Sequence, residues 1–262
     1  MLRSLYTAAT GMEAQQLKMD TIANNLANAS TTGFKKVRAD FEDVLSETLK
    51  SGGQTDGRDA ISPTSLQVGL GVKTGSTTTS QTQGSLTNTQ NPTDLAIQGS
   101  GLFRIAQANG DLAFTRAGNF RISSDGHLVT QNGESLDPAI QVPPQATGIT
   151  IGPDGTVNAT MAGKPDPTRL GTIELAVFTN PAGLNRIGNN LMVETPASGP
   201  AQMVKPGDQG SGSLAQGSLE GSNVQAVEEM IDLISTQRSY EMSSQVITTA
   251  DQMLQRLTQM QR

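Results

Sequence analysis

The N-terminal stretch LRSLYTAATGMEAQQLKMDTIANNL, residues 2–26, decides the first element of the fold. Apolar and small residues recur in it at alternating steps of three and four, with Gln16 the single polar member of the set Leu2, Leu5, Ala9, Met12, Gln16, Met19, Ala23 and Leu26. This heptad-like spacing predicts an amphipathic helix. The helix should stop at Asn28-Ala29-Ser30-Thr31-Thr32-Gly33, because these residues bond their own backbone or supply a positive φ. A short second helix is predicted at residues 40–49, with Asp40 as its N-cap and one apolar face made of Phe41, Val44, Leu45 and Leu49.

The C-terminal stretch predicts a longer helix, from Asn223 to Met260. Ser222-Asn223-Val224-Gln225 fits a capping box, with Ser222 as N-cap and Gln225 as N3. The apolar residues of this helix form two offset stripes, Val224, Val227, Ile231 and Ile234 in the first and Val246, Ala250, Met253, Leu257 and Met260 in the second. Because the stripe changes face near residues 238–241, we do not expect one straight two-stranded coiled coil.

The middle of the chain predicts β-hairpins. Four turn dipeptides lie between short apolar runs: Asn109-Gly110, Asp125-Gly126, Asn132-Gly133 and Asp154-Gly155. Such dipeptides tolerate the positive φ of type I′ turns and are the strongest short-range signal for a hairpin. A further strand is predicted at residues 172–178, and the polar segments 51–65 and 197–213, rich in Gly, Ser and Pro, are interpreted as linkers.

The composition excludes several kinds of site. The 262 residues include no Cys and one His, so neither a thiolate nor a multi-histidine metal site is possible, and there is no disulfide or Cys nucleophile. A net charge of −6 argues against nucleic-acid binding. No apolar run is long enough for membrane insertion, and the N-terminus lacks the apolar segment of a secretory signal. The lone His127 follows a turn and has no nucleophile or orienting group at a suitable spacing, so we predict no catalytic residue, no metal site, no cofactor and no enzymatic activity.

These elements predict an α+β fold in which long N- and C-terminal α-helices form a helical stalk and flank a turn-rich, mainly antiparallel β middle domain. The expected parts are an N-terminal helical assembly region at residues 1–50, a polar Gly- and Ser-rich linker at 51–68, a β-rich middle domain at 69–213 and a C-terminal helical assembly region at 214–262.

The terminal helices leave two interpretations open. They could pair with each other within one chain, or their apolar stripes could pack against neighbouring subunits. A chain with 35% hydrophobic and 3% aromatic residues has little apolar surface to stabilise a two-helix stalk, which favours the second interpretation. Head-to-tail contacts of that kind do not close, and they produce helical filaments.

Two long motifs resemble the terminal signatures of bacterial flagellar rod and hook proteins. The first is Ala23-Asn24-Asn25-Leu26-Ala27-Asn28-Ala29-Ser30-Thr31-Thr32-Gly33-Phe34-Lys35-Lys36. The second runs from Leu219-Glu220-Gly221-Ser222-Asn223-Val224 through Glu228-Glu229-Met230 to Thr236-Gln237-Arg238-Ser239-Tyr240-Glu241. Residues 69–72, 82–86 and 94–103 are also similar to this family, and the ending Thr249-Ala250-Asp251-Gln252-Met253-Leu254-Gln255 is most similar to its distal rod members.

The resemblance implies a structural subunit of the distal rod in the flagellar basal body. Such a subunit self-assembles through its terminal helices into a hollow helical drive shaft, which crosses the periplasm and transmits torque from motor to hook. The resemblance also implies export through the flagellum's own type III apparatus, without a cleaved signal peptide. The implied partners are further copies of the chain in a helical filament, other rod subunits, the hook protein, and the surrounding outer-membrane and peptidoglycan ring proteins, with no nucleic acid and no membrane insertion.

The residues expected to carry assembly are Leu5, Met12, Met19, Leu26, Gly33, Phe34, Val227, Ile231, Ile234, Val246, Met253 and Leu257. Gly33 is expected to supply a backbone turn and Phe34 an apolar plug after the first helix. Three alternatives remain: a proximal rod subunit of the same family, a secreted β-rich binding module whose helical ends anchor it, and a hydrolase of cell-wall glycan with paired carboxylates in the β region.

Overall fold

The structure is a computed structural model that describes residues 2–50, 55–56, 60–61, 64–107, 109–162, 166–208 and 210–260. The chain forms two compact units, each made of segments that are separated in sequence. The first unit combines Met1–Leu26, Val37–Thr78 and Ala226–Arg262, and the second combines Ala27–Lys36 and Thr79–Gln225. The chain therefore passes between the two units four times.

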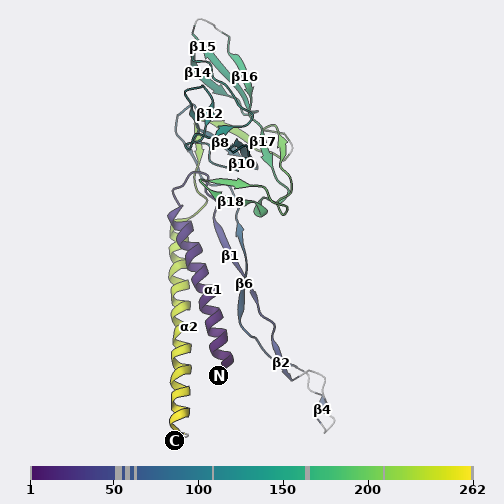
Figure 1. Cartoon of the computed structure of the whole chain (residues 1–262), viewed down its shortest axis with the longest axis vertical. Helices are drawn as coiled ribbons and strands as arrows, with labels where there is room; N and C mark the ends of the chain where they lie inside the picture. The colour runs from purple at the N-terminus through teal and green to yellow at the C-terminus, as the bar shows by residue number, and fades with distance from the viewer. Residues whose placement is uncertain are drawn as a thin grey trace. The chain divides into compact units, whose positions relative to one another are not determined.

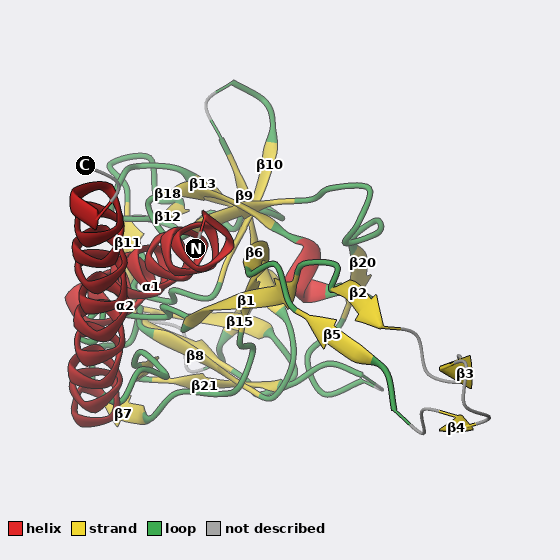
Figure 2. Ribbon diagram, turned by 90° about the horizontal axis from the view of Figure 1, so that it is seen from below, coloured by secondary structure: helices red, strands yellow, loops and turns green. Residues whose placement is uncertain are grey.

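Two antiparallel α-helices, α1 (Leu2–Ala27) and α2 (Ala226–Met260), lie side by side in the first unit (Figures 1 and 2). Asn25 Nδ2 donates a hydrogen bond of 3.2 Å to Glu229 Oε2. Earlier in α1, a Cβ placed on Gly11 would lie 3.9 Å from Ser243 Oγ. The end of α1, at Asn25, therefore lies beside the start of α2, at Glu229, and the earlier Gly11 lies beside the later Ser243. The two helices run in opposite directions.

The helical part of the predicted fold class is wrong. Within the part of the chain that the structure describes, α1 and α2 are the only α-helices, and the residues buried on them are mostly small or polar: Ala8, Ala14, Ile22 and Asn25 of α1, with Glu229, Thr236 and Ala250 of α2. Among the described side chains that the sequence pattern assigned to apolar stripes of α2, the following are exposed instead: Val227, Ile231, Ile234, Val246 and Met253. The two helices therefore do not form the expected stalk held by apolar seams, and they share their unit with β-strands.

These strands form a β-ribbon between residues 37 and 79, shown beside α1 in Figure 1. β1 (Val37–Asp43) pairs with β6 (Val72–Thr79), β2 (Glu47–Lys50) with β5 (Leu66–Val68), and β3 (Thr55–Asp56) with β4 (Ala60–Ile61). The last two pairs are antiparallel. Most of the remaining residues of the expected linker 51–68 lie outside the described residues.

The predicted short helix at residues 40–49 is also wrong, because this segment contributes to β1 and β2. Asp40 does not cap a helix; its carboxylate accepts hydrogen bonds from Thr78 Oγ1 at 2.6 Å and from Arg38 Nε at 2.8 Å. Thr78 lies in β6, a strand that ends in three threonines, which favour extended structure. The partner strand lies more than 30 residues away, so the local pattern could not reveal it.

The second unit is built on a nine-stranded antiparallel sheet. Its main path has the order β11-β12-β13-β9-β10-β19-β18, and β17 pairs with β9 and with β20. These strands are β9 (Leu102–Ala106), β10 (Leu112–Thr115), β11 (Arg121–Ile122), β12 (Leu128–Val129), β13 (Ser135–Leu136), β17 (Leu175–Val177), β18 (Asn185–Gly188), β19 (Leu191–Val193) and β20 (Gln202–Val204). A 3₁₀ turn, η1 (Pro181–Gly183), lies between β17 and β18.

Three smaller sheets complete this unit. β14 (Ala146–Ile151), β15 (Thr156–Met161) and β16 (Thr168–Thr172) form an antiparallel sheet, shown together in Figure 1. β8 (Leu95–Gln98) pairs with β21 (Ser213–Gln216), and β7 (Leu86–Asn88) pairs with β22 (Ser218–Glu220). The main core includes Ile97, Phe103 and Phe120, with the last two rings packed edge to face at 5.1 Å between centroids.

All four predicted hairpins are confirmed, but their turns are not of type I′, because only the glycine of each dipeptide has a positive φ. The glycines of the four dipeptides have φ between +80° and +87°, and the flanking strands pair as β9–β10, β11–β12, β12–β13 and β14–β15. The strand predicted at residues 172–178 contains β17. The linker predicted at residues 197–213 is wrong in part, because β20 lies inside it and pairs with β17.

Candidate functional site

Three charged side chains from distant parts of the chain are buried together in the second unit. Glu220, the last residue of β22, accepts a hydrogen bond from Lys35 Nζ at 2.6 Å on one carboxylate oxygen and from Arg116 Nε at 2.5 Å on the other. The side chains of Glu220, Lys35 and Arg116 are 1%, 3% and 5% exposed. Gly84 N adds a hydrogen bond of 2.9 Å to Glu220 Oε1. We call Lys35, Arg116 and Glu220 the charge cluster; burying such charges requires partners of this kind in place of water.

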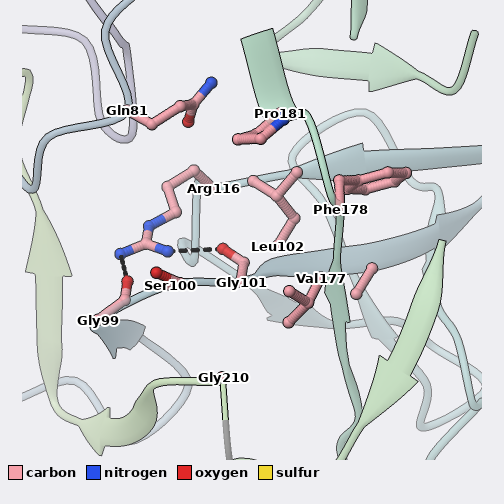
Figure 3. Close-up of a pocket in the computed structure, with 11 residues that line it drawn as sticks. Gln81, Gly99, Ser100, Gly101, Leu102, Arg116, Val177, Phe178, Pro181 and Gly210 are labelled. Carbon is pink, nitrogen blue, oxygen red and sulfur yellow. Dashed lines mark hydrogen bonds between the residues drawn. The ribbon is translucent and has the colours of Figure 1, made fainter. Parts of the chain in front are cut away.

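Arg116 is held by backbone carbonyls of the turn between β8 and β9. Its Nη1 donates to Gly101 O at 2.5 Å, and its Nη2 donates to Gly99 O at 2.6 Å and to Ile97 O at 2.9 Å. Figure 3 shows the bonds to Gly99 and Gly101. Both glycines have positive φ, of +110° and +133°, so the turn depends on residues without a Cβ to aim its carbonyls at the guanidinium.

The electrostatics of the charge cluster are those of one anion between two cations. Burial opposes ionisation of Glu220, but Arg116 and Lys35 outweigh this effect and hold the pKa of its carboxyl below the usual range. Burial lowers the pKa of the Lys35 ammonium, Glu220 acts against this change, and the Arg116 cation adds to it. The cluster therefore carries an excess positive charge, with Glu220 ionised at neutral pH.

The charge cluster belongs to a wider network that joins residues 31–36 to residues 219–223. Asn223 is its second centre: its Oδ1 accepts a hydrogen bond from Lys36 N at 2.6 Å. Its Nδ2 donates to Ser80 O and Thr82 O, both at 3.0 Å. Lys35 Nζ also donates to Thr82 O, at 2.8 Å. The two terminal motifs therefore meet within the second unit.

Gly33 and Phe34, two of the predicted assembly residues, lie in this network. Gly33 N donates to Glu220 O at 2.8 Å, and Gly33 has φ +69°. A Cβ at Gly33 would lie 2.6 Å from Ala117 N, so the backbone approach requires glycine. The half-buried Phe34 ring carries the Arg186 guanidinium 5.0 Å from its centroid, a cation–π contact.

The second candidate site is the exposed apolar side of α2, which we call the α2 outer face. It comprises Val227, Met230, Ile231, Ile234, Met242, Val246 and Met253. Val227, Ile231 and Ile234 are 72%, 62% and 51% exposed. The buried residues of α2 are Glu229, Thr236 and Ala250, so this helix buries small or polar side chains and exposes its longer apolar ones. Such an arrangement indicates an interaction surface.

The other predicted assembly residues are less exposed or lie outside the described side chains. Leu5, Met12, Met19 and Leu26 of α1 are half-buried. The side chain of Leu257 lies outside the described residues. The role of all twelve predicted residues in assembly remains a proposal.

The charge cluster was not predicted from the sequence. Lys35 and Glu220 lie in the two terminal motifs, but no spacing rule connects positions so far apart, and Arg116 lies in a third segment. The available signal was their position beside turn-forming residues: Lys35 lies two residues after Gly33, and Glu220 directly precedes Gly221.

Neither a metal site nor a membrane span emerges from the described residues. No group of three or more His, Asp or Glu side chains among them is arranged to hold a metal ion. None of the described helices combines the length and the apolar character needed to cross a membrane.

Three flagellar family descriptions match separate segments of the chain. "Flagella basal body rod protein" matches residues 5–35, "Flagellar hook protein FlgE/F/G D1 domain" matches residues 96–159, and "Flagellar basal body rod FlgEFG protein C-terminal" matches residues 215–260. The flagellar basal-body rod protein FlgG of Caulobacter vibrioides is 48% identical over 99% of both chains. The FlgG protein of Agrobacterium fabrum is 46% identical, over 96% of this chain and 97% of the relative. The FlgG protein of Bacillus subtilis is 41% identical over the full length of both chains.

The chain belongs to the flagellar basal-body rod protein family. It is a structural protein of the flagellum, and its place is the basal-body rod. The recognition of this family from the two terminal motifs is confirmed. Each residue of the charge cluster falls in a different matched segment: Lys35 in the first, Arg116 in the second and Glu220 in the third. In this rod protein, the cluster joins the three segments that the family descriptions separate.

Proposed function

We propose that this rod protein is a subunit of the distal rod, and that it polymerises through α1 and α2 into a hollow helical shaft. The shaft transmits torque from the motor to the hook. The subunit has a mechanical role and no catalytic one. Its partners are further copies of the same chain, adjoining rod subunits, the hook protein, and the ring proteins of the outer membrane and the peptidoglycan layer.

The observation that carries the polymerisation proposal is the α2 outer face. Complete burial of one Val, Ile or Met side chain contributes roughly 1.5–3 kcal/mol. Seven such side chains stand exposed on one helix while its buried positions are small or polar. Contact with helices of neighbouring copies would bury them, and the half-buried Met12 and Met19 of α1 are the complementary candidates.

Identity to relatives from one organism supports the distal assignment over another position in the same structure. The Bacillus subtilis rod protein FlgG is 41% identical to this chain, whereas the hook-basal body complex protein FlhP of the same organism is 32% identical. The alternative of a secreted binding module expected a stable monomer with satisfied helices, and the exposed α2 outer face argues against it.

The test is polymerisation of the purified full chain, followed by sedimentation and electron microscopy. Ile234→Asp places a charge on the α2 outer face without touching the buried positions of α2. We expect this variant to keep its circular dichroism spectrum and to remain unassembled. Met12→Asp tests the α1 side in the same way.

Gln131→Asp is the control for added charge, because Gln131 is an exposed polar residue that belongs to the second unit and to neither helix. This variant should polymerise as the unaltered chain does. Filaments of normal length from Ile234→Asp would overturn the proposal. A block caused equally by Gln131→Asp would assign the effect to added charge rather than to the apolar face.

A further inference from the structure

A cavity of about 170 Å³ opens in the second unit beside Arg116 (Figure 3). Its polar lining includes Gln81, Ser100 and Arg116, and its apolar lining includes Leu102, Phe178 and Pro181. A protein cavity of about 150 Å³ can hold a molecule the size of benzene. The cavity is therefore large enough for a small organic ligand with one polar end and one apolar end.

Two hydrogen-bond donor groups at the polar end lack an acceptor among the described residues. The Nε2 atom of Gln81 is buried and has no hydrogen-bond partner among the described residues. A guanidinium has five N–H donors. Arg116 uses four of them, on Glu220, Gly101, Ile97 and Gly99, which leaves one N–H of Nη1 without an acceptor in the described part of the chain. Buried donors of this kind favour a ligand that only accepts hydrogen bonds.

The net charge of the charge cluster also favours an anionic ligand in this cavity. Arg116 and Lys35 share the single carboxylate of Glu220, and no other described carboxylate forms an ion pair with either of them. The excess positive charge is buried, where Coulomb attraction is less screened than in water. An anion in the cavity would therefore be held more strongly than one on the surface.

We propose that this cavity binds a carboxylate carried on a short apolar stem. The carboxylate accepts a hydrogen bond from the remaining Nη1 N–H of Arg116, and a turn of the Gln81 amide, whose Nε2 is buried out of reach of the cavity, allows a second, while the stem packs against Leu102, Phe178 and Pro181. A planar carboxylate matches the geometry of a guanidinium. The apolar wall favours such a ligand over inorganic phosphate, because phosphate has no apolar part to bury there.

The test is a titration of the ¹⁵N-labelled full chain with sodium butyrate, followed by NMR. We expect saturable shifts of the Gly99, Ser100 and Leu102 amides, with a Kd in the millimolar range. Sodium chloride at equal ionic strength should not reproduce them, and inorganic phosphate should bind more weakly. Shifts that fail to saturate, or that chloride reproduces, would overturn the proposal.

Two further arms identify the source of the carboxylate and test the residues. N-acetylglutamate amide carries the same group as a protein side chain. If it binds as butyrate does, a partner's Glu can be the ligand, and if only butyrate binds, the site takes a free organic acid. Gln81→Leu should weaken butyrate binding about tenfold. Gln131→Leu, at a residue of the same unit that does not line this cavity, should leave it unchanged. Equal affinity in Gln81→Leu and the unaltered chain would contradict the assignment.

Discussion

Lys35 and Glu220, separated by 185 positions in the sequence, form an ion pair with 2.6 Å between Nζ and Oε1. Lys35 belongs to residues 27–36, a short segment of the second unit between two segments of the first. The ion pair, with Asn223 and Gly33 beside it, holds this segment in the second unit. Three predictions concern this network and a fourth concerns the helices.

Glu220→Gln should destabilise the second unit by about 3–5 kcal/mol, because it leaves two buried cations without their anion. Urea unfolding followed by circular dichroism measures the change. Glu47→Gln is the control, since Glu47 pairs with Arg3 at the surface and exposed pairs contribute little. Equal unfolding midpoints for the two variants would show that the charge cluster does not stabilise the fold.

Acid should destabilise the protein in part through Glu220. Its folded-state pKa lies below its unfolded value of about 4.3, so its contribution is fully present above that pH and is lost as the pH falls through the folded-state pKa. The unfolding free energy, measured as a function of pH below 4.3, should therefore decrease less steeply in Glu220→Gln than in the unaltered chain. Equal slopes of the unfolding free energy against pH below 4.3 in the variant and the unaltered chain would contradict an ionised Glu220.

Gly33→Ala should cost more than Gly110→Ala, although both glycines have positive φ. A Cβ at Gly33 would lie 2.6 Å from Ala117 N, whereas a Cβ at Gly110 meets no atom within 4 Å. Gly110→Ala should cost about 1 kcal/mol for the left-handed conformation, and Gly33→Ala should cost at least 1 kcal/mol more for the displaced backbone. Thermal unfolding of both variants measures the two losses of stability. Equal losses would show that a Cβ at Gly33 meets no neighbouring atom.

The antiparallel contact of α1 and α2 can be tested by cross-linking, because the chain has no cysteine of its own. Gly11→Cys combined with Ser243→Cys should form an intramolecular disulfide on mild oxidation, since a Cβ at Gly11 lies 3.9 Å from Ser243 Oγ. The pair Gly11→Cys and Met242→Cys is the control, because Met242 lies on the α2 outer face. A shift in mobility on non-reducing gels reports the bond. Efficient cross-linking of the control pair alone would show that the α2 outer face, and not the side with Ser243, lies against α1.

The sequence by itself determined the elements that depend on neighbouring residues. The dipeptides Asn109-Gly110, Asp125-Gly126, Asn132-Gly133 and Asp154-Gly155 predicted four hairpins, because the positive φ in each turn depends only on its glycine. The long helices at the two ends followed from their spacing of apolar residues, with boundaries that the structure moves by a few residues. The terminal motifs were sufficient to recognise the family.

Tertiary structure decided which faces meet and which distant residues pair. The apolar pattern of α2 specified a helix but not that its small and polar side would be buried and Ile231 and Ile234 exposed. Residues 40–49 had a helical pattern, yet Thr78 and the strand around it made them extended. Lys35, Arg116 and Glu220 form one cluster only because β-sheet pairing brings three distant segments together. Periodicity and turn chemistry act within a few residues, whereas these choices depend on the free energy of contacts made across the whole chain.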